Sequence, residues 1–214
     1  RARGALRKGS RITAATQLLT YSDMTIFENR GRRTLNEAST VEEFLGLRAD
    51  LGAFALGSYF AELLETVSAE EYPDPPVLQL GLNSLYALSR ALCPPEQIKA
   101  VFELRLMCLA GYEPDLSCCA RCGAPEPVEP WLSLRGGAVY CAQCRGASSS
   151  AVTPLLPETL AAMRHVVNAD PKRIFSFTLG DAGRRQLARV CEEYTAMQLE
   201  RGFASLDYWK KVKD

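Results

Sequence analysis

Apolar residues recur at helical spacing through much of the chain after residue 40. The first such run contains Phe44, Leu47, Leu51, Phe54, Ala55, Tyr59 and Leu63. Thr40 and Glu43 fit a capping box, in which a hydroxyl and a carboxylate three residues apart satisfy free backbone N–H groups. We therefore expect one helix from this box to about Val67.

Similar periodicity predicts further helices over residues 78–92, 95–111, 157–168 and 181–202. Pro95 suits the first turn of its helix, and Asp181 suits a helix start. Prolines between residues 70 and 76 indicate a connector, and residues 172–179 an extended or turn-like segment.

The first 40 residues have a different pattern. Ile12, Ala14 and Thr16 alternate with other residues, as strand residues do, and residues 29–32 (Asn-Arg-Gly-Arg) are typical of a hairpin turn. We expect two to four short strands here. Because a few strands alone are marginally stable, we expect them to belong to a larger sheet or barrel. The chain starts with Arg1 and not Met, so we expect it to be a fragment whose first strands are missing.

Composition narrows the class of protein. The chain has 214 residues, of which 47% are hydrophobic, enough for one large or two smaller cores. The formal net charge is zero, so any attraction to nucleic acid or membrane must come from local charge. The sequence has no apolar run long enough to span a bilayer and no secretion signal.

Residues 112–150 lack helical periodicity and carry two C-x-x-C pairs. Cys119 and Cys122 form the first pair, and Cys141 and Cys144 the second. Two intervening residues let both thiolates of a pair reach one ion, and four thiolates complete a tetrahedron. We expect one structural zinc ion, with no open position for catalysis.

Other interpretations of the eight cysteines are weaker. Four disulfides would suit a small secreted domain, and a thioredoxin-like pair would follow a strand of a βαβ unit; neither context is present. Cys118 could replace Cys119 as a ligand, although the C-x-x-C spacing favours Cys119. Cys93, Cys108 and Cys191 lie on helical patterns and are interpreted as small core residues.

Catalytic chemistry is not evident in the sequence. His165 is the only histidine, lies beside an apolar helical face and has no catalytic partner nearby. No phosphate-binding or nucleophile motif occurs, and Gly136-Gly137 is interpreted as a hairpin turn. We predict that the protein is not an enzyme.

Basic residues are concentrated in two places. Residues 1–33 contain eight cations and two carboxylates; the cations are Arg1, Arg3, Arg7, Lys8, Arg11, Arg30, Arg32 and Arg33. This excess suits phosphate contact without sequence preference, although a solubilising arm would look similar. A second basic group, Lys172, Arg173, Arg184, Arg185 and Arg189, lies near Phe175 and Phe177 and could hold an acidic, aromatic-ended peptide. Taken alone, this pattern is more typical of an amphipathic helix that packs on the core.

The ordered set of motifs resembles the RecO family of bacterial recombination mediators. It comprises Leu109-x-Gly-Tyr-x-Pro-x-Leu116, both cysteine pairs, Leu132-Ser133, Gly136-Gly137, Thr34-Leu-Asn-Glu-Ala38, Phe175-Ser-Phe177 and Leu199-Glu-Arg-Gly-Phe203. The zinc spacing alone is shared by many proteins, but the ordered set covers nearly the whole chain.

This resemblance implies an α+β protein. A partial OB-fold would occupy residues 1–40 and a mainly helical domain residues 41–214, with the zinc module embedded at 112–150. It implies a protein without enzymatic activity that binds single- and double-stranded DNA and anneals complementary strands. With RecR it would help load RecA on strands coated by the single-strand-binding protein SSB. It also implies a cytoplasmic, nucleoid-associated protein that needs neither membrane nor nucleotide.

Carried onto this sequence, the expected DNA contacts are Arg1, Arg3, Arg7, Lys8 and Arg11, with Arg30, Arg32 and Arg33 as an extension. The SSB C-terminal tail is assigned, from charge, to Arg173, Arg184, Arg185 and Arg189. Two alternatives remain open: a zinc-containing protein-interaction adaptor that does not bind DNA directly, and a metal-dependent enzyme, which would require an open metal position.

Overall fold

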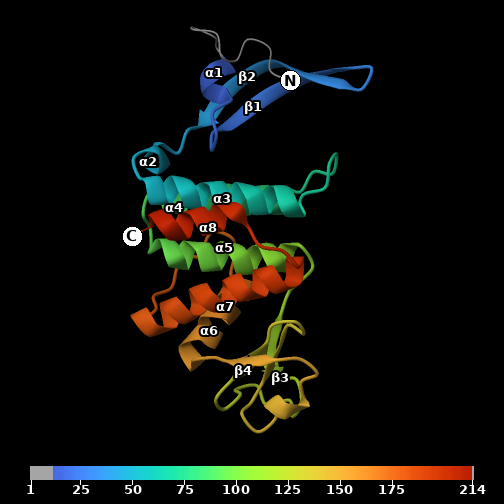
Figure 1. Ribbon diagram of the computed structural model, residues 1–214, viewed down its shortest axis with the longest axis vertical. Helices are drawn as coiled ribbons and strands as arrows, with labels where there is room; N and C mark the ends of the chain where they lie inside the picture. Colours follow the sequence, from blue (N-terminus) through green and yellow to red (C-terminus); the bar gives the residue numbers. More distant parts are fainter. Residues whose placement is uncertain (1–11, 214) are drawn as a thin grey trace.

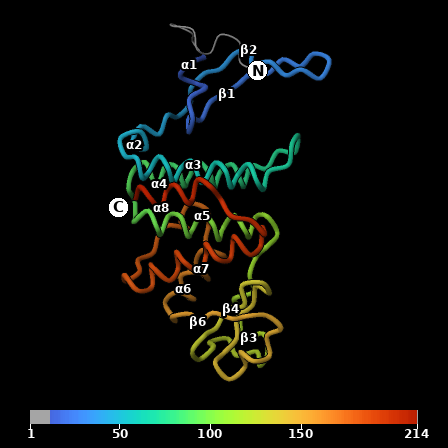
Figure 2. The backbone as a smooth tube through the Cα atoms, in the orientation of Figure 1, coloured from blue at the N-terminus to red at the C-terminus, as the bar shows by residue number. Residues whose placement is uncertain are grey.

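The structure, a computed structural model, describes residues 12–213 and arranges them in three tiers. A two-stranded hairpin lies at one end, a layer of helices occupies the middle, and a small sheet with the cysteine pairs lies at the other end (Figures 1 and 2). None of the described helices is long and apolar enough to cross a membrane.

The hairpin pairs β1 (Tyr21–Asn29) with β2 (Arg32–Glu42) in antiparallel register, Asn29 opposite Arg32. Arg30 and Gly31 form the two-residue turn, with φ of 50° and 72°. Positive φ at both positions is the geometry of a type I′ turn, which matches the twist of paired strands. The predicted hairpin turn is thus confirmed. A closed OB barrel is not seen in residues 12–213, where β1 and β2 form a sheet of their own.

Two predictions at the start of the chain are wrong. Residues 12–15, expected in a strand, form the short helix α1 (Ile12–Ala15). The backbone N–H of Thr16 donates to the carbonyl of Ile12 and extends this turn. Thr40 does not cap a helix, because it lies in β2 opposite Ser22. Three alternating positions over five residues are too few to distinguish a strand from one turn of helix.

The helix expected from the Thr40–Glu43 capping box to Val67 is broken in two. α2 (Leu45–Arg48) follows Phe44, which is buried with a positive φ of 47°, and α3 (Leu51–Val67) starts anew. Asp50 separates them, because its side chain accepts a hydrogen bond from the Ala53 N–H at 2.7 Å and caps α3.

The helical layer is built around α5 (Pro95–Leu109), in which ten of fifteen residues are buried. α3, α4 (Pro75–Ser89), α6 (Pro157–Asn168) and α7 (Asp181–Leu199) each contact α5. Phe60 of α3 stacks on Phe102 of α5 with ring centroids 4.2 Å apart. α8 (Ala204–Val212), which periodicity did not reveal, covers α3.

One charged pair lies inside this layer. Lys99 and Glu103, one turn apart on α5, are buried and paired at 2.9 Å, and Lys99 also reaches Glu192 of α7 at 3.0 Å. Burial alone would lower the pKa of Lys99, but the carboxylates of Glu103 and Glu192 raise it above its ordinary value. Tyr59 donates its hydroxyl to Glu103 at 2.8 Å, so the buried carboxylate has a second partner.

The third tier is a four-stranded sheet in the order β3-β5-β4-β6. Its strands are β3 (Asp115–Cys119), β4 (Trp131–Ser133), β5 (Ala138–Tyr140) and β6 (Val152–Pro154). β4 and β5 form a hairpin whose turn contains Gly136 and Gly137, as predicted. The fold is therefore mixed α and β, with the cysteine module inserted between α5 and α6.

Candidate metal centre and nucleic-acid interface

Each cysteine pair occupies a tight turn at the end of a strand. Cys119 ends β3, and the N–H of Gly123 donates to its carbonyl at 2.8 Å. Gly123 has a φ of 74°, a conformation that favours glycine. Cys141 follows β5, and the N–H of Cys144 donates to its carbonyl at 2.9 Å. These turns direct both thiols of each pair toward one point.

The four sulfurs form a compact cluster. All lie within 4.8 Å of one another, and Cys141 Sγ is 3.9 Å from both Cys119 Sγ and Cys122 Sγ. A disulfide would require about 2.05 Å. A zinc ion with bonds of about 2.3 Å would space its four sulfurs about 3.8 Å apart. The cluster therefore has the ligands and spacing for a tetrahedral metal ion and is the one such group among residues 12–213.

The backbone favours negative charge at one sulfur of the cluster. Burial acts to raise the pKa of Cys119, but hydrogen bonds from the N–H groups of Cys122, Cys141 and Arg121 outweigh burial. The pKa of Cys119 is lowered to about 6. Neighbouring thiols, led by Cys141, hydrogen bond with Cys144 and raise its pKa to about 12. Without a cation the cluster resists holding four charges, and a bound divalent ion would supply the compensation.

The remaining cysteines lie outside the cluster. Cys118, the possible substitute for Cys119, is not among the four clustered residues; its sulfur lies 3.7 Å from the Ser117 hydroxyl. Cys191 is buried in α7 and Cys108 partly buried in α5, as expected for small core residues. Cys93 lies in the bend between α4 and α5, so its helical assignment is wrong.

Arg164 of α6, which drew no attention in the sequence, joins the cysteine module to the helices. Its guanidinium donates to the carbonyls of Leu116 at 2.7 Å, Ser117 at 3.2 Å and Pro125 at 2.6 Å. It also pairs with Glu126 at 2.9 Å. From α7, Tyr194 donates to the carbonyl of Tyr112 at 2.8 Å. The bonds of Arg164 hold the chain on both sides of the Cys119–Cys122 turn, and no sequence motif predicts them.

The basic residues of the hairpin gather at its far end. Arg30 lies in the turn, and Arg32 and Arg33 begin β2. Within the described chain, Arg30 and Arg32 form no ion pair, whereas Arg33 pairs with Glu28, Glu70 and Glu71. Arg1, Arg3, Arg7, Lys8 and Arg11 lie outside the described residues.

Exposed apolar side chains accompany these cations. Phe27 is 61% exposed and Ile26 57%, although both lie on a strand. An exposed ring close to arginines is the combination on which nucleic-acid bases stack while their phosphates are neutralised. The sequence identified the cations but not Phe27, because the exposure of its ring depends on where the hairpin lies in the fold.

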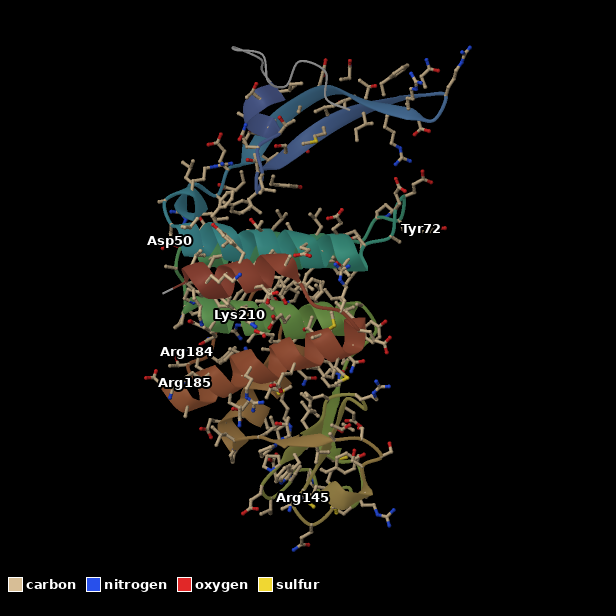
Figure 3. All side chains as sticks on the ribbon, in the orientation of Figure 1. Asp50, Tyr72, Arg145, Arg184, Arg185 and Lys210 are labelled. Atoms are coloured by element: carbon tan, nitrogen blue, oxygen red, sulfur yellow. The ribbon has the colours of Figure 1, made fainter. Side chains whose placement is uncertain are left out.

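A groove of about 430 Å³ crosses the helical layer, between α7 and α8. Arg184, Arg185 and Arg189 line it, together with Lys210, Lys213 and Trp209 of the C-terminal segment. The acidic residues Glu96 and Glu192 also belong to its lining. Figure 3 shows Arg184 and Arg185 near the start of α7 and Lys210 on α8. Arg184 pairs with Asp181 and Arg189 with Glu193, while Arg185 forms no ion pair within residues 12–213. Arg173, predicted to act with them, does not line this groove.

His165 has a structural environment. Its Nε2 lies 3.0 Å from the carbonyl of Arg173, and its ring meets Phe177 edge-on at 5.2 Å. Both contacts fix the connector between α6 and α7. They give the histidine a packing role.

Comparison with known proteins identifies the family of this chain. The family described as "Recombination protein O C terminal" matches residues 48–207, which is more than half of the chain. The chain belongs to the RecO family. The matched region of this RecO chain begins at the end of α2 and ends within α8, so it includes α3 to α7 and the whole cysteine module.

Individual relatives extend the match through the hairpin. "DNA repair protein RecO" of Acetivibrio thermocellus is 31% identical over 211 residues, covering 99% of this chain and 84% of that protein. The proteins of the same name from Symbiobacterium thermophilum and Heliobacterium modesticaldum are 30% and 32% identical over 211 and 200 residues. These alignments cover 97% and 90% of this chain, and 83% and 71% of the relatives.

Proposed function

We propose that this RecO-family chain is a DNA repair protein that mediates recombination without enzymatic activity. It binds single- and double-stranded DNA, anneals complementary strands and, together with RecR, helps load RecA on SSB-coated single strands. Family membership supports the role in DNA repair. The observation that carries direct DNA contact is the tip of the hairpin, where Arg30 and Arg32 form no ion pair within the described chain. Arg32 lies opposite Asn29, two residues along β1 from the exposed Phe27.

The proposed DNA contacts also include the basic residues at the start of the sequence. Arg1, Arg3, Arg7, Lys8 and Arg11 add charge to the hairpin cations, and Phe27 offers a ring for base stacking. Arg33 contributes where it can leave its carboxylate partners. Such a surface follows the sugar-phosphate backbone and bases of a strand without reading a particular sequence.

One structural zinc ion would be held by Cys119, Cys122, Cys141 and Cys144. Four thiolates fill its coordination sphere, so the ion would stabilise the module and offer no site for a substrate. In this assignment the metal supports the fold and DNA binding lies elsewhere, because the cysteine cluster is in the third tier and the hairpin in the first (Figure 1).

The groove between α7 and α8 would bind the acidic SSB C-terminal tail. Arg184, Arg185 and Arg189 would meet its carboxylates, and the Trp209 side would receive an aromatic end. Replacing Arg185 with Ala should weaken binding of an acidic, Phe-ended peptide. The same change at Arg121, an exposed residue of the cysteine module, should not. Equal effects of the two substitutions would contradict the assignment.

Salt-dependent binding of a fluorescent single-stranded oligonucleotide tests the central proposal. Affinity should fall steeply with salt, by a slope of about 0.7 for each neutralised phosphate. Replacing Arg3, Arg7 and Lys8 with Ala, or Arg30 and Arg32 with Gln, should weaken binding and flatten that slope. Binding that ignores salt and both sets of substitutions would contradict direct contact. Capture of RecR by a chain with no DNA affinity would instead favour the adaptor function.

A further inference from the structure

The hairpin is held to the helical layer at two separated places. Near its base, the side chain of Leu19 packs on Gly57 of α3, and Arg48 donates to the carbonyl of Leu18 and the hydroxyl of Thr20 at 3.2 and 3.0 Å. Near its tip, the contact is made by Arg33 and the loop between α3 and α4. That loop carries Tyr72 and rises toward the hairpin in Figure 3.

All three guanidinium nitrogens of Arg33 face carboxylates. Its Nε donates to Glu28 of the neighbouring strand at 3.1 Å, its Nη1 donates to Glu70 at 2.9 Å, and its Nη2 donates to Glu71. Glu71 has a φ of 69°, which forms a tight turn, and both loop carboxylates reach the same guanidinium. Three carboxylates around one cation leave a negative excess beside the most basic part of the hairpin.

This arrangement presents Arg33 with groups that resemble its expected ligand. Carboxylates and phosphates both bind a guanidinium through paired N–H donors. Glu70 and Glu71 are mostly exposed, with side-chain accessibilities of 86% and 70%, so their attraction for Arg33 is screened and reversible. A nucleic-acid strand carries a dense row of phosphates and can compete with such pairs.

We propose that Glu70 and Glu71 form an autoinhibitory latch, occupying Arg33 until the phosphates of a nucleic-acid strand displace them. The latch leaves Arg30 and Arg32 available for the first encounter. Displacement then frees the tip of the hairpin from the helical layer, while the contacts of Leu19 and Arg48 keep its base attached. This inference rests on the proposed binding of nucleic acid by the hairpin.

An autoinhibitory latch and ion pairs that only stabilise the hairpin predict different effects on nucleic-acid binding. Removing the loop carboxylates should make the chain bind nucleic acid more tightly, because Arg33 no longer has to leave a partner. A structural tie would give the opposite result, since its loss would leave the tip less ordered. The sign of the change in affinity therefore distinguishes the two roles.

The test compares the unmodified chain with a variant carrying Glu70→Gln and Glu71→Gln. Binding of a fluorescent oligothymidylate is measured by anisotropy at several salt concentrations. We expect the variant to bind at least about threefold more tightly at low salt, the gain from releasing two exposed ion pairs. Its salt slope should steepen by up to about 0.7, the contribution of one further phosphate contact on a single strand.

A matched control carries Glu65→Gln and Glu129→Gln. Both residues are exposed, neither forms an ion pair within the described chain, and the pair of changes removes the same charge. We expect little change in its affinity. In a background with Arg33→Gln, adding the two latch substitutions should have no further effect, because the coupling requires the guanidinium.

The outcomes separate this inference from the proposed function. If the unmodified chain binds and the latch variant binds no better than the control, or more weakly, the latch is overturned and the proposed function stands. If the gain persists without Arg33, it comes from charge alone and the latch is also overturned. If the unmodified chain binds no nucleic acid, the proposed function fails and the inference fails with it.

Discussion

Two small sheets lie at opposite ends of the molecule, and they are stabilised in different ways. The cysteine module has four thiols clustered within 4.8 Å, and Arg164 fixes it to the helices through three carbonyls. The hairpin has exposed apolar side chains, and exposed ion pairs hold its tip. The contrast fits the proposed roles, in which the module supports the fold and the hairpin contacts DNA.

The largest expected effect concerns the cysteine cluster. Cys122→Ser removes one of the four clustered thiols, so under the proposed zinc assignment we expect loss of metal binding and unfolding of residues 112–150, because metal binding and folding of such a module are coupled. Metal content and thermal unfolding would measure this. Cys118→Ser is the matched control, since Cys118 lies outside the cluster. A Cys122→Ser chain that kept both its metal and its stability would refute the assignment.

A smaller effect is expected where the module joins the helices. Arg164→Ala deprives the carbonyls of Leu116, Ser117 and Pro125 of their donor, at a cost of about 2 kcal/mol in the free energy of unfolding. Denaturant titration would measure that loss, and metal content should stay unchanged. Arg121→Ala provides the comparison, because Arg121 is an exposed residue of the Cys119–Cys122 turn. It should change the free energy of unfolding little.

The smallest effect is expected at the base of the hairpin. Arg48→Gln removes two exposed hydrogen bonds to residues 18 and 20, and we expect a loss of less than about 1 kcal/mol. Amide exchange should nevertheless quicken in β1 and β2, because few other contacts hold the hairpin. Unchanged exchange there would show that the hairpin is anchored more firmly than its contacts indicate.

Local chemistry explains what the sequence could predict. The cysteine spacing specified the cluster, because each C-x-x-C turn is set by its own residues. The proline at position 157 marked the start of α6, and the Arg30-Gly31 pair marked the hairpin turn. Apolar residues that recur at helical spacing identified α4, α5 and α7 for the same reason.

Tertiary contacts explain what the sequence could not predict. Lys99 and Glu103 look like an exposed pair one turn apart, and only the packing of α3 and α7 against α5 gives them the partners Tyr59 and Glu192. Arg164 is one of many arginines until α6 lies against the module. Helix α8 is too short for periodicity to reveal, and Asp50 divides an apolar pattern that runs across it.

The most direct test of this contrast is the annealing of complementary DNA strands, with and without SSB. We predict that the unmodified chain accelerates annealing, that Arg30→Gln with Arg32→Gln removes most of the acceleration, and that Cys122→Ser retains it at temperatures where the helical layer stays folded. The account would be contradicted if the hairpin variant annealed as fast as the unmodified chain while the cysteine variant, still helical, was inactive.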